Sequence, residues 1–238
     1  MKYELDMHTH TIASGHAYST MAEMIEAAHQ KGLKALGIVE HTSAMPGTCD
    51  DIYFLNLKVV PREQKGMKIY LGAEVNIIDY EGNIDLPQRC TDCLDYAIAS
   101  FHPPCLKPGT VEENTQAVLK IMENPKVRII GHPDDGRFPL DYESLVKGAK
   151  EHGVLLEVNN NSLNPNGFRH NTVENCSKML ELCKQYQVPV IMNSDAHITF
   201  EVGDYNYSQP VIEKLDFPEE LIVNTSLEKW IDFIEEKR

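Results

Sequence analysis

The sequence has no long hydrophobic run, and no stretch of it approaches the about 20 apolar residues that a membrane-spanning helix needs. The first residues also lack the basic segment followed by an apolar segment that marks a secretory signal peptide. These two absences argue against an integral membrane protein and against a secreted one. We therefore expect a cytoplasmic protein that has no membrane partner.

Positive charge is scarce in this chain. Lysine and arginine together number 22 against 36 aspartates and glutamates, which gives a formal net charge of −14 at pH 7. Such a chain is repelled by the phosphates of nucleic acid and by anionic membrane surfaces, so we expect neither as a partner. An anionic substrate would have to be attracted by a positive centre confined to the binding site.

Cysteine motifs give little support for a disulfide framework or a structural zinc site. Cys90 and Cys93 form a single C-x-x-C, and no second pair follows to complete four ligands. Without a secretory signal, all six cysteines are expected to be reduced thiols. The sequence also has no G-x-S-x-G motif, so a serine nucleophile of that kind is not expected.

No glycine- or serine-rich linker interrupts the chain, which predicts one domain over residues 1–238. Apolar strands alternate with amphipathic helices along it. Strands are predicted over residues 2–7, 35–39, 68–73, 96–101, 127–130, 154–158 and 188–192, and helices over 20–32, 89–94, 110–124, 141–152, 172–187 and 226–236. This alternation predicts an α/β fold with parallel strands in a closed or nearly closed barrel, with a doubly wound sheet as the alternative.

Side chains that can ligate metals follow six of the seven predicted strands. They are His8, His10, His16, His41, Glu74, His102, His132, Asp195 and His197. In a parallel α/β barrel the carboxyl ends of all strands meet on one face, where the βα loops form the active site. Histidines without a common role would be scattered, as His29, His152 and His170 are. Seven of the ten histidines at the same end of a repeated unit therefore predict a metal centre.

Two pairs of these residues have a spacing that suits chelation. His8 and His10 are two apart in a strand, so their side chains point to the same side, and Asp195 and His197 repeat that spacing. Imidazole and carboxylate ligands without thiolate favour zinc, manganese or iron over copper(I) or an iron–sulfur cluster. Nine ligands are too many for one ion. We expect two or three divalent metal ions, with zinc as the expected metal and Glu74 as the shared bridge.

The same motifs, in this order, resemble those of the polymerase and histidinol phosphatase (PHP) family. They are H-T-H at residues 8–10, the loop with His16, E-H at 40–41, G-A-E at 72–74, S-F-H at 100–102, G-H-P at 131–133 and N-S-D-A-H at 193–197. H-A-Y-S-T at 16–20 and E-V-N-N at 157–160 look most similar to the small stand-alone, YcdX-like phosphatase branch. The resemblance implies a single-domain, distorted (βα)7 TIM-like barrel with a trinuclear metal site.

Carried over motif by motif, the resemblance also assigns the ligands. His8, His10, Glu74 and Asp195 would hold one ion, Glu74, His102 and His132 a second, and His16, His41 and His197 a third. In one departure, Glu40 precedes His41 where the family more often has Asp, which leaves the role of Glu40 open.

Clustered divalent ions suit phosphomonoester hydrolysis, because they activate water and neutralise charge on the phosphoryl group and on the leaving oxygen. We predict a metal-dependent phosphatase in which metal-bound hydroxide attacks a small phosphorylated substrate. Glu74 and Asp195 are the predicted catalytic residues, and Asp195 is also a candidate acceptor for the proton of the water. A phosphodiesterase or 3′-to-5′ exonuclease, an amidohydrolase and a non-catalytic metal-binding module are the alternatives.

A few polar residues outside the ligand set could also serve this site. Arg137 follows strand five and could either reach the substrate phosphate or lie in solvent. Asn159, Asn160 and Asn161 end the one strand that has no proposed ligand, where they could line the pocket or orient ligands. The sequence does not predict the substrate or the oligomeric state.

Overall fold

Seven parallel strands form the inner layer of the fold in the computed structural model, which describes residues 1–236. In hydrogen-bonded order they are β1 (Leu5–Thr9), β2 (Ala35–His41), β4 (Met67–Asn76), β5 (Ala97–Ser100), β6 (Val127–Ile130), β7 (Leu155–Asn159) and β8 (Val190–Asn193). The short β3 (Glu63–Gln64), which was not predicted, pairs antiparallel with the start of β4.

The first and last strands bring the barrel close to closure. A single parallel bridge joins Thr9 to Ala196, and the backbone N–H of Met7 donates to Asn193 Oδ1 over 2.9 Å. The predicted distorted (βα)7 barrel is therefore confirmed, and the alternative of a doubly wound sheet is wrong.

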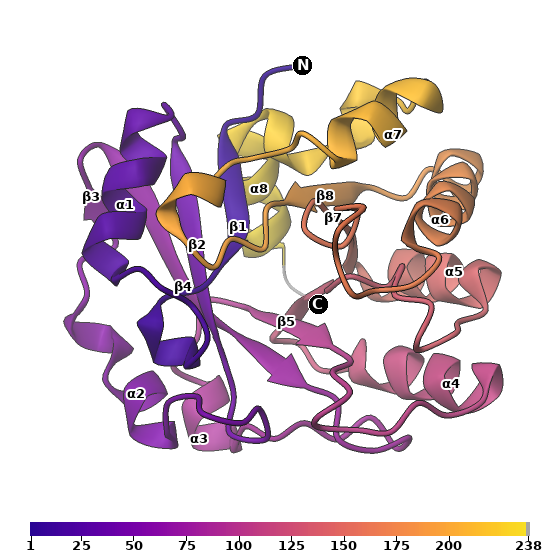
Figure 1. The fold of residues 1–238 in the computed structure, drawn as a ribbon, viewed down its shortest axis with the longest axis horizontal. Coiled ribbons are helices and arrows are strands. Elements are labelled where there is room, and N and C mark those ends of the chain that lie inside the picture. Colours follow the sequence, from indigo (N-terminus) through magenta and orange to yellow (C-terminus); the bar gives the residue numbers. More distant parts are fainter. Residues whose placement is uncertain (237–238) are drawn as a thin grey trace.

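Helices surround the strands on the outside of the barrel (Figure 1). They are α1 (Met21–Gln30), α2 (Asp51–Leu55), α3 (Gln88–Thr91), α4 (Val111–Ile121), α5 (Tyr142–His152), α6 (Thr172–Tyr186), α7 (Ser208–Lys214) and α8 (Leu227–Glu235). Of these, α2 and α7 are not among the helices predicted above. Capping boxes start α1 at Thr20 with Glu23 and α4 at Thr110 with Glu113, because in each pair both backbone N–H groups are satisfied by the partner side chain.

The interior of the barrel is apolar at the amino-terminal ends of its strands. Eleven buried residues form this cluster: Leu5, Met7, Ala35, Val39, Tyr96, Ile98, Ile129, Leu155, Ile191, Val223 and Trp230. A second and larger apolar cluster lies between the strands and the surrounding helices. Because apolar side chains fill the amino-terminal half of the barrel interior, polar side chains gather at the carboxyl ends of the strands.

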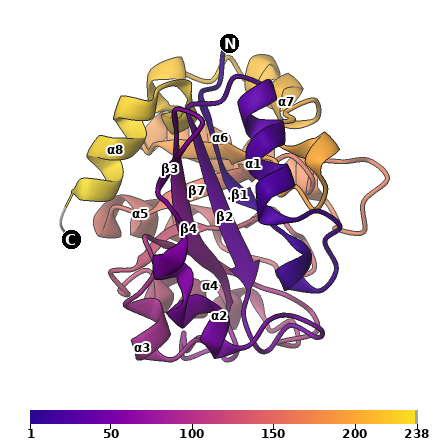
Figure 2. The ribbon, with the colours of Figure 1, turned by 90° about the vertical axis from the view of Figure 1, so that its left-hand side faces the viewer.

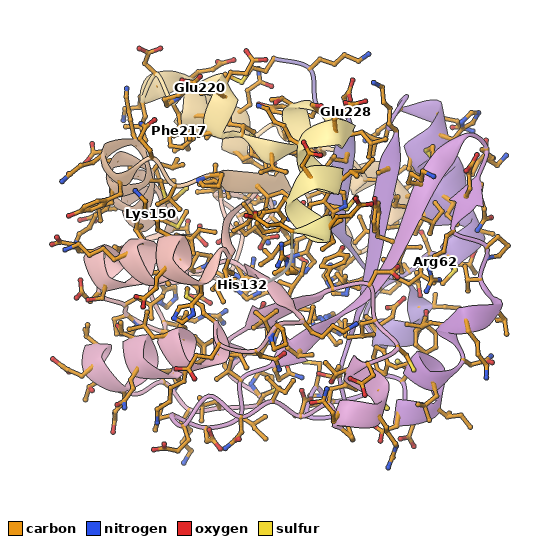
Figure 3. All side chains as sticks on the ribbon, turned by 180° about the vertical axis from the view of Figure 1, so that it is seen from behind. Arg62, His132, Lys150, Phe217, Glu220 and Glu228 are labelled. Carbon is orange, nitrogen blue, oxygen red and sulfur yellow. The ribbon has the colours of Figure 1, made fainter. Side chains whose placement is uncertain are left out.

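The last helix closes the amino-terminal end of the barrel, opposite the βα loops. Figure 2 shows α8 on one side of the strands, and Figure 3, from behind, shows it lying across them. Trp230 is fully buried, with its ring centroid 5.2 Å from that of Tyr96 and 5.6 Å from that of Tyr70. Arg128 donates to the carbonyl of Phe233, and the backbone N–H of Leu227 donates to Glu4 Oε2 over 3.0 Å.

Most predicted elements are observed with their ends shifted by a few residues. The strand predicted over 68–73 continues to Asn76, so Glu74 lies inside a rigid strand instead of after it. The predicted domain of residues 1–238 includes 237 and 238, which lie outside the described residues. Within residues 1–236, the helices are all too short or too polar to cross a membrane.

We predict that Trp230→Ala destabilises the protein strongly, because it leaves a cavity at the base of the barrel that the surrounding rings cannot refill. The expected loss is about 3–5 kcal/mol of unfolding free energy, measured by urea denaturation. Phe200→Ala is the control, because Phe200 is 80% exposed and its loss should change stability by about 0.5 kcal/mol or less. Equal effects of the two substitutions would contradict the role given to α8.

Candidate metal centre

All nine predicted ligands come together at the carboxyl ends of the strands. His8 lies in β1, His41 ends β2, Glu74 lies in β4, His102 and His132 follow β5 and β6, Asp195 and His197 follow β8, and His10 and His16 lie after β1. Figure 3 places His132 near the middle of the molecule, within the ring of helices. Seven of the nine side chains are almost fully buried, and His16 and His197 lie closer to solvent.

Four of these residues converge on one point. His8 Nε2 and His10 Nε2 are 3.1 Å apart, and each lies 3.4 Å from Glu74 Oε2. The two nitrogens lie 3.6 and 3.4 Å from Asp195 Oδ1. Four ligands in a tetrahedron at about 2.0–2.1 Å from a zinc ion are roughly 3.3–3.4 Å from one another. The spacing of these donor atoms therefore fits a shared metal ion.

The second oxygen of Glu74 faces a different pair of imidazoles. His132 Nε2 lies 3.0 Å from Glu74 Oε1, and His102 Nε2 lies 3.3 Å from it. Because Oε1 and Oε2 face separate groups of nitrogens, the carboxylate has the arrangement of a bridging ligand.

The remaining histidines form a group that is joined to the other two. His16 Nε2 and His197 Nε2 are 3.2 Å apart, and the ring of His41 stacks between those of His10 and His16. His41 Nδ1 lies 2.9 Å from Glu74 Oε2, so His41 is nearer to Glu74 than the family assignment implies.

Two buried polar atoms at this position lack a hydrogen-bond partner in the described part of the chain. His41 Nδ1 and Glu74 Oε2 have no hydrogen-bond partner within residues 1–236, although both are inaccessible to solvent. A cation between them would remove the cost of burying both atoms unpaired. The residues present therefore fit a metal ion.

Hydrogen bonds fix the tautomer of four imidazoles. His8 Nδ1 lies 2.7 Å from Glu157 Oε1, His10 Nδ1 3.1 Å from Ser14 Oγ, His102 Nδ1 2.7 Å from Asn76 Oδ1, and His197 Nδ1 2.9 Å from the carbonyl of Asp195. With the proton held on Nδ1, the lone pair on Nε2 is directed into the centre, which is how metal-binding histidines are commonly oriented.

Charge within the cluster matches the needs of a cation site. Burial raises the pKa of Glu74, but the surrounding imidazoles, His102 first, outweigh it and hold the pKa well below its usual range. Burial lowers the pKa of His8, but Glu157, Glu74 and Asp195 outweigh it and raise the pKa well above its usual range. A field that attracts a proton this strongly also attracts a metal cation.

The structure gives Glu40 a role that the sequence left open. Ser14 Oγ donates to Glu40 Oε2 over 2.6 Å, and Thr11 Oγ1 donates to Glu40 Oε1 over 2.6 Å. Since Ser14 Oγ also accepts from His10 Nδ1, the Glu40 carboxylate orients His10 through Ser14.

Sequence reasoning missed Glu157, the buried carboxylate that supports two ligands at once. Besides His8 Nδ1, it accepts hydrogen bonds from the backbone N–H of His132 over 2.8 Å and from the side chains of Asn159 and Asn193. The sequence could have pointed to Glu157 by its position two residues before Asn159 in β7, because this spacing places both side chains on the same face of the strand.

Sequence reasoning also missed Asp85, which orients a ligand from the loop after β4. Its carboxylate accepts from Ala44 N over 2.6 Å and from Asn76 Nδ2 over 2.7 Å. This turns the carbonyl of the Asn76 side chain toward His102. Nothing in the local sequence signals that contact, because it depends on where two loops meet.

The three asparagines after β7 have three different positions. Asn159 Nδ2 donates to Asp195 Oδ2 over 3.2 Å, and Asn161 lines the cavity above the ligands. Asn160 Oδ1 instead accepts from the backbone N–H groups of Tyr207 and Ser208, where α7 begins. One asparagine therefore orients a ligand, one lines the pocket, and one supports the fold.

A cavity of about 560 Å³ opens over the centre. Besides His16, His41, Glu74, His102, Asp195 and His197, it is lined by Met45, Pro46, Pro103, Pro104, Arg137, Asn161, Phe168 and Arg169. Arg137 thus lies at the cavity wall and not free in solvent. Arg169, which was not predicted, is largely buried and donates to Asp195 Oδ2 from Nη2 over 3.2 Å.

The backbone is strained at two of the ligands. His132 has φ of 32° and Asp195 has φ of 57°, in the left-handed region that residues other than glycine seldom adopt. Such strain persists only where surrounding contacts hold it, and it is concentrated at functional sites.

We predict that Glu157→Gln weakens metal binding about 10–100-fold, because the amide places a donor against groups that need an acceptor. Titration of the purified protein against a chromophoric chelator measures this. The matched control is Glu143→Gln on the exposed side of α5, which should leave metal affinity unchanged. Unaltered affinity in Glu157→Gln would show that this carboxylate does not support the ligands.

Relatives of this chain are found along its whole length. Residues 6–192 match the PHP domain family. A probable phosphatase of Clostridium novyi is 46% identical over 237 residues, which cover 100% of this chain and 96% of the relative. A probable phosphatase of Caldicellulosiruptor saccharolyticus is 45% identical over 234 residues, which cover 98% of this chain and 97% of the relative.

Solved structures share the fold at low sequence identity. Histidinol phosphate phosphatase from Lactococcus lactis, solved with zinc, L-histidinol and phosphate, has a TM-score of 0.60 at 17% identity, over 91% of this chain and 95% of that chain. A chain of archaeal ribonuclease P with mature tRNA has a TM-score of 0.59 at 18% identity, over 97% of this chain and 90% of that chain.

The relatives bear on the predictions made from the motifs. The prediction of a phosphatase related to the PHP family is confirmed by the family match and by the two probable phosphatases. The nine ligands stay a prediction, although the structure brings them together. The chain therefore belongs to the PHP domain family.

Proposed function

We propose that this chain is a metal-dependent phosphatase that hydrolyses small phosphate monoesters at a centre of two or three divalent ions. One observation carries the proposal. Glu74 is one of nine donor side chains from six strand ends, and its carboxylate oxygens lie 2.9–3.4 Å from five imidazole nitrogens. An arrangement of buried donors this dense needs cations to balance it.

The ligands divide into three groups around that carboxylate. As the family resemblance implies, His8, His10, Glu74 and Asp195 would hold one ion, Glu74, His102 and His132 a second, and His16, His41 and His197 a third. The donor atoms support the first group, where those of His8, His10 and Glu74 lie within 4.8 Å of one another, and His41 lies as close to Glu74 and His102 as to His10 and His197. Zinc is the proposed metal, with manganese or iron as alternatives, because the donors are imidazoles and carboxylates. Divalent cations bound there supply Lewis acidity, which activates water and neutralises charge on the phosphoryl group.

Glu74 and Asp195 are the residues we propose as catalytic. Glu74 would keep its negative charge between two groups of metal ligands, since one carboxylate oxygen faces His8 and the other faces His132. Asp195 Oδ1 faces the nitrogens of His8 and His10, where it can accept a hydrogen bond from the attacking water. Burial raises the pKa of Asp195, but His8, His10 and Arg169 outweigh burial and hold this pKa well below its usual range, so the carboxylate stays ionised and able to accept that hydrogen bond.

The cavity above the centre favours a small substrate. About 560 Å³ accommodates a phosphoryl group and a leaving group of a few carbons or one ring. Arg169 is held against Asp195, so its guanidinium remains close to the place where charge develops on the phosphoryl oxygens. The protein carries a net charge of −14, so an anionic substrate needs a local positive centre to attract it. The proposed metal ions and Arg169 would supply that positive charge within this pocket.

We also propose that residues 1–238 form one metallohydrolase domain that works in the cytoplasm. Support for the single domain comes from the barrel strands between Leu5 and Asn193 and from α8, which packs back against the base of the barrel.

We predict that the metal-replete protein contains two to three metal ions per chain and hydrolyses p-nitrophenyl phosphate faster than bis-p-nitrophenyl phosphate. Elemental analysis and absorbance at the p-nitrophenolate band measure both quantities. Removal of metal with a chelator should abolish turnover, and addition of zinc or manganese should restore it. Activity on the diester alone would favour the alternative of a phosphodiesterase.

A full metal load without turnover of any ester would favour the alternative of a non-catalytic metal-binding module. Less than one metal ion per chain would exclude the proposal.

We predict that Glu74→Gln lowers kcat/KM for p-nitrophenyl phosphate more than about 100-fold, because the neutral amide cannot bridge two cations. The metal content should fall at two sites together, as measured by elemental analysis. Glu63→Gln is the matched control, since Glu63 is exposed on β3 away from the centre. Retention of both metal and activity in Glu74→Gln would remove this residue as the bridge.

A further inference from the structure

A row of alternating charges leads from the candidate metal centre to the wall of the cavity. Asp195 Oδ2 accepts from Arg169 Nη2 over 3.2 Å, and Arg169 Nε lies 4.0 Å from Asp135 Oδ2. The same Asp135 oxygen accepts from Arg137 Nη2 over 2.6 Å. Arg137 is the outermost member of the row, and Arg169 and Asp135 lie between it and Asp195.

Arg137 is held rigidly by one edge of its guanidinium group. Its Nε also donates to Asp135, over 3.0 Å to Oδ1 and 2.9 Å to Oδ2, so the pairing is bidentate. The guanidinium carbon lies 5.2 Å from the centroid of the Phe168 ring. No hydrogen-bond partner of Nη1 is found among the described residues, and the side chain is 22% exposed. A fixed arginine with two free N–H donors at a cavity wall is equipped to bind an anion.

The charges that line this cavity favour an anion at that position. Its only acidic residues among the described lining are Glu74 and Asp195, and both are proposed metal ligands. One carboxylate, Asp135, lies beside two guanidinium groups, those of Arg137 and Arg169. A carboxylate suits the site better than a second phosphate, because it is the smaller of the two anions that arginine binds and the cavity of about 560 Å³ also has to hold the scissile phosphoryl group.

We propose that Arg137 binds a carboxylate on the leaving group, so that the preferred substrates are phosphate monoesters of hydroxy acids. This inference rests on the proposed function, because it assumes that the scissile phosphate lies at the metal centre. Arg137 then binds the far end of the substrate, whose carboxylate accepts a hydrogen bond from Nη1. The ring of Phe168 lies against the guanidinium of Arg137 in a cation–π contact, which helps to hold that group in place.

The first experiment compares two esters that differ in one group. 3-Phosphoglycerate carries a carboxylate where glycerol 3-phosphate carries a hydroxymethyl group. For the metal-loaded wild type we expect a kcat/KM about tenfold higher or more for 3-phosphoglycerate, the usual effect of a charged hydrogen bond. In Arg137→Gln that ratio should fall below about 2, mainly through a higher KM for 3-phosphoglycerate.

The matched control removes a different arginine that is paired with an aspartate. Arg62, labelled in Figure 3, pairs with Asp95 over 3.2 Å and does not line the cavity. Arg62→Gln should keep the wild-type preference. Absence of a preference in the wild type, or an equal loss for both esters in Arg137→Gln, would overturn the inference and leave the phosphatase activity itself established.

If neither ester is hydrolysed, that result counts against the proposed function. A binding measurement then still tests the inference about Arg137. Calorimetry with the metal-loaded protein would compare 3-phosphonopropionate with propylphosphonate, which lacks the carboxylate. The inference requires that the first binds about tenfold tighter to the wild type and to Arg62→Gln, but not to Arg137→Gln. Equal binding of the two phosphonates to the wild type would overturn it.

Discussion

The buried carboxylate of Glu74 carries a negative charge that the residues around it must balance. Its two oxygens face five imidazole nitrogens in an interior from which water is nearly excluded. Burial alone would favour the neutral acid, but the imidazoles keep the group ionised. A carboxylate that stays ionised while it is buried among imidazoles attracts cations into the space between them. The proposed metal ions would balance these charges within the interior.

The barrel supplies rigidity to that centre in two ways. Its lower interior is packed with apolar side chains and closed by Trp230, so the polar groups are confined to the carboxyl ends of the strands. Around the ligands, buried acceptors hold the imidazole rings: Glu157 behind His8, Ser14 with Glu40 behind His10, and Asn76 with Asp85 behind His102. In these three ligands the Nε2 atom is oriented by a hydrogen bond on the opposite side of the ring, which would lower the reorganisation needed when a metal binds.

The ligand positions could be predicted because they follow a rule of the fold. Residues such as His41 and Glu74 come at strand ends, and parallel strands bring their ends to one face, so position along the chain implies proximity in space. The barrel itself could be predicted for the same reason, from the alternation of apolar strands and helices. His8 and His10 needed only the two-residue period of a strand.

Other parts of the site depend on how loops meet, which a local pattern does not encode. Asp85 reaches Asn76 only because the loop after β4 folds back, and Arg169 reaches Asp195 from a loop 26 residues away in sequence. The asparagines of residues 159–161 illustrate the limit, because their common chemistry predicts one role and the structure gives three. The closeness of His41 to Glu74 likewise follows from the register of β2 against β4, which pairs these two residues directly.

The central claim is that Glu74 bridges two of the metal ions held at the strand ends. Anomalous diffraction from metal-loaded crystals, measured at the absorption edge of the bound metal, tests it most directly. The account predicts two or three peaks, with two of them each about 2.0–2.2 Å from a different oxygen of Glu74. A single peak, or several peaks with no ion in contact with Glu74, would contradict it.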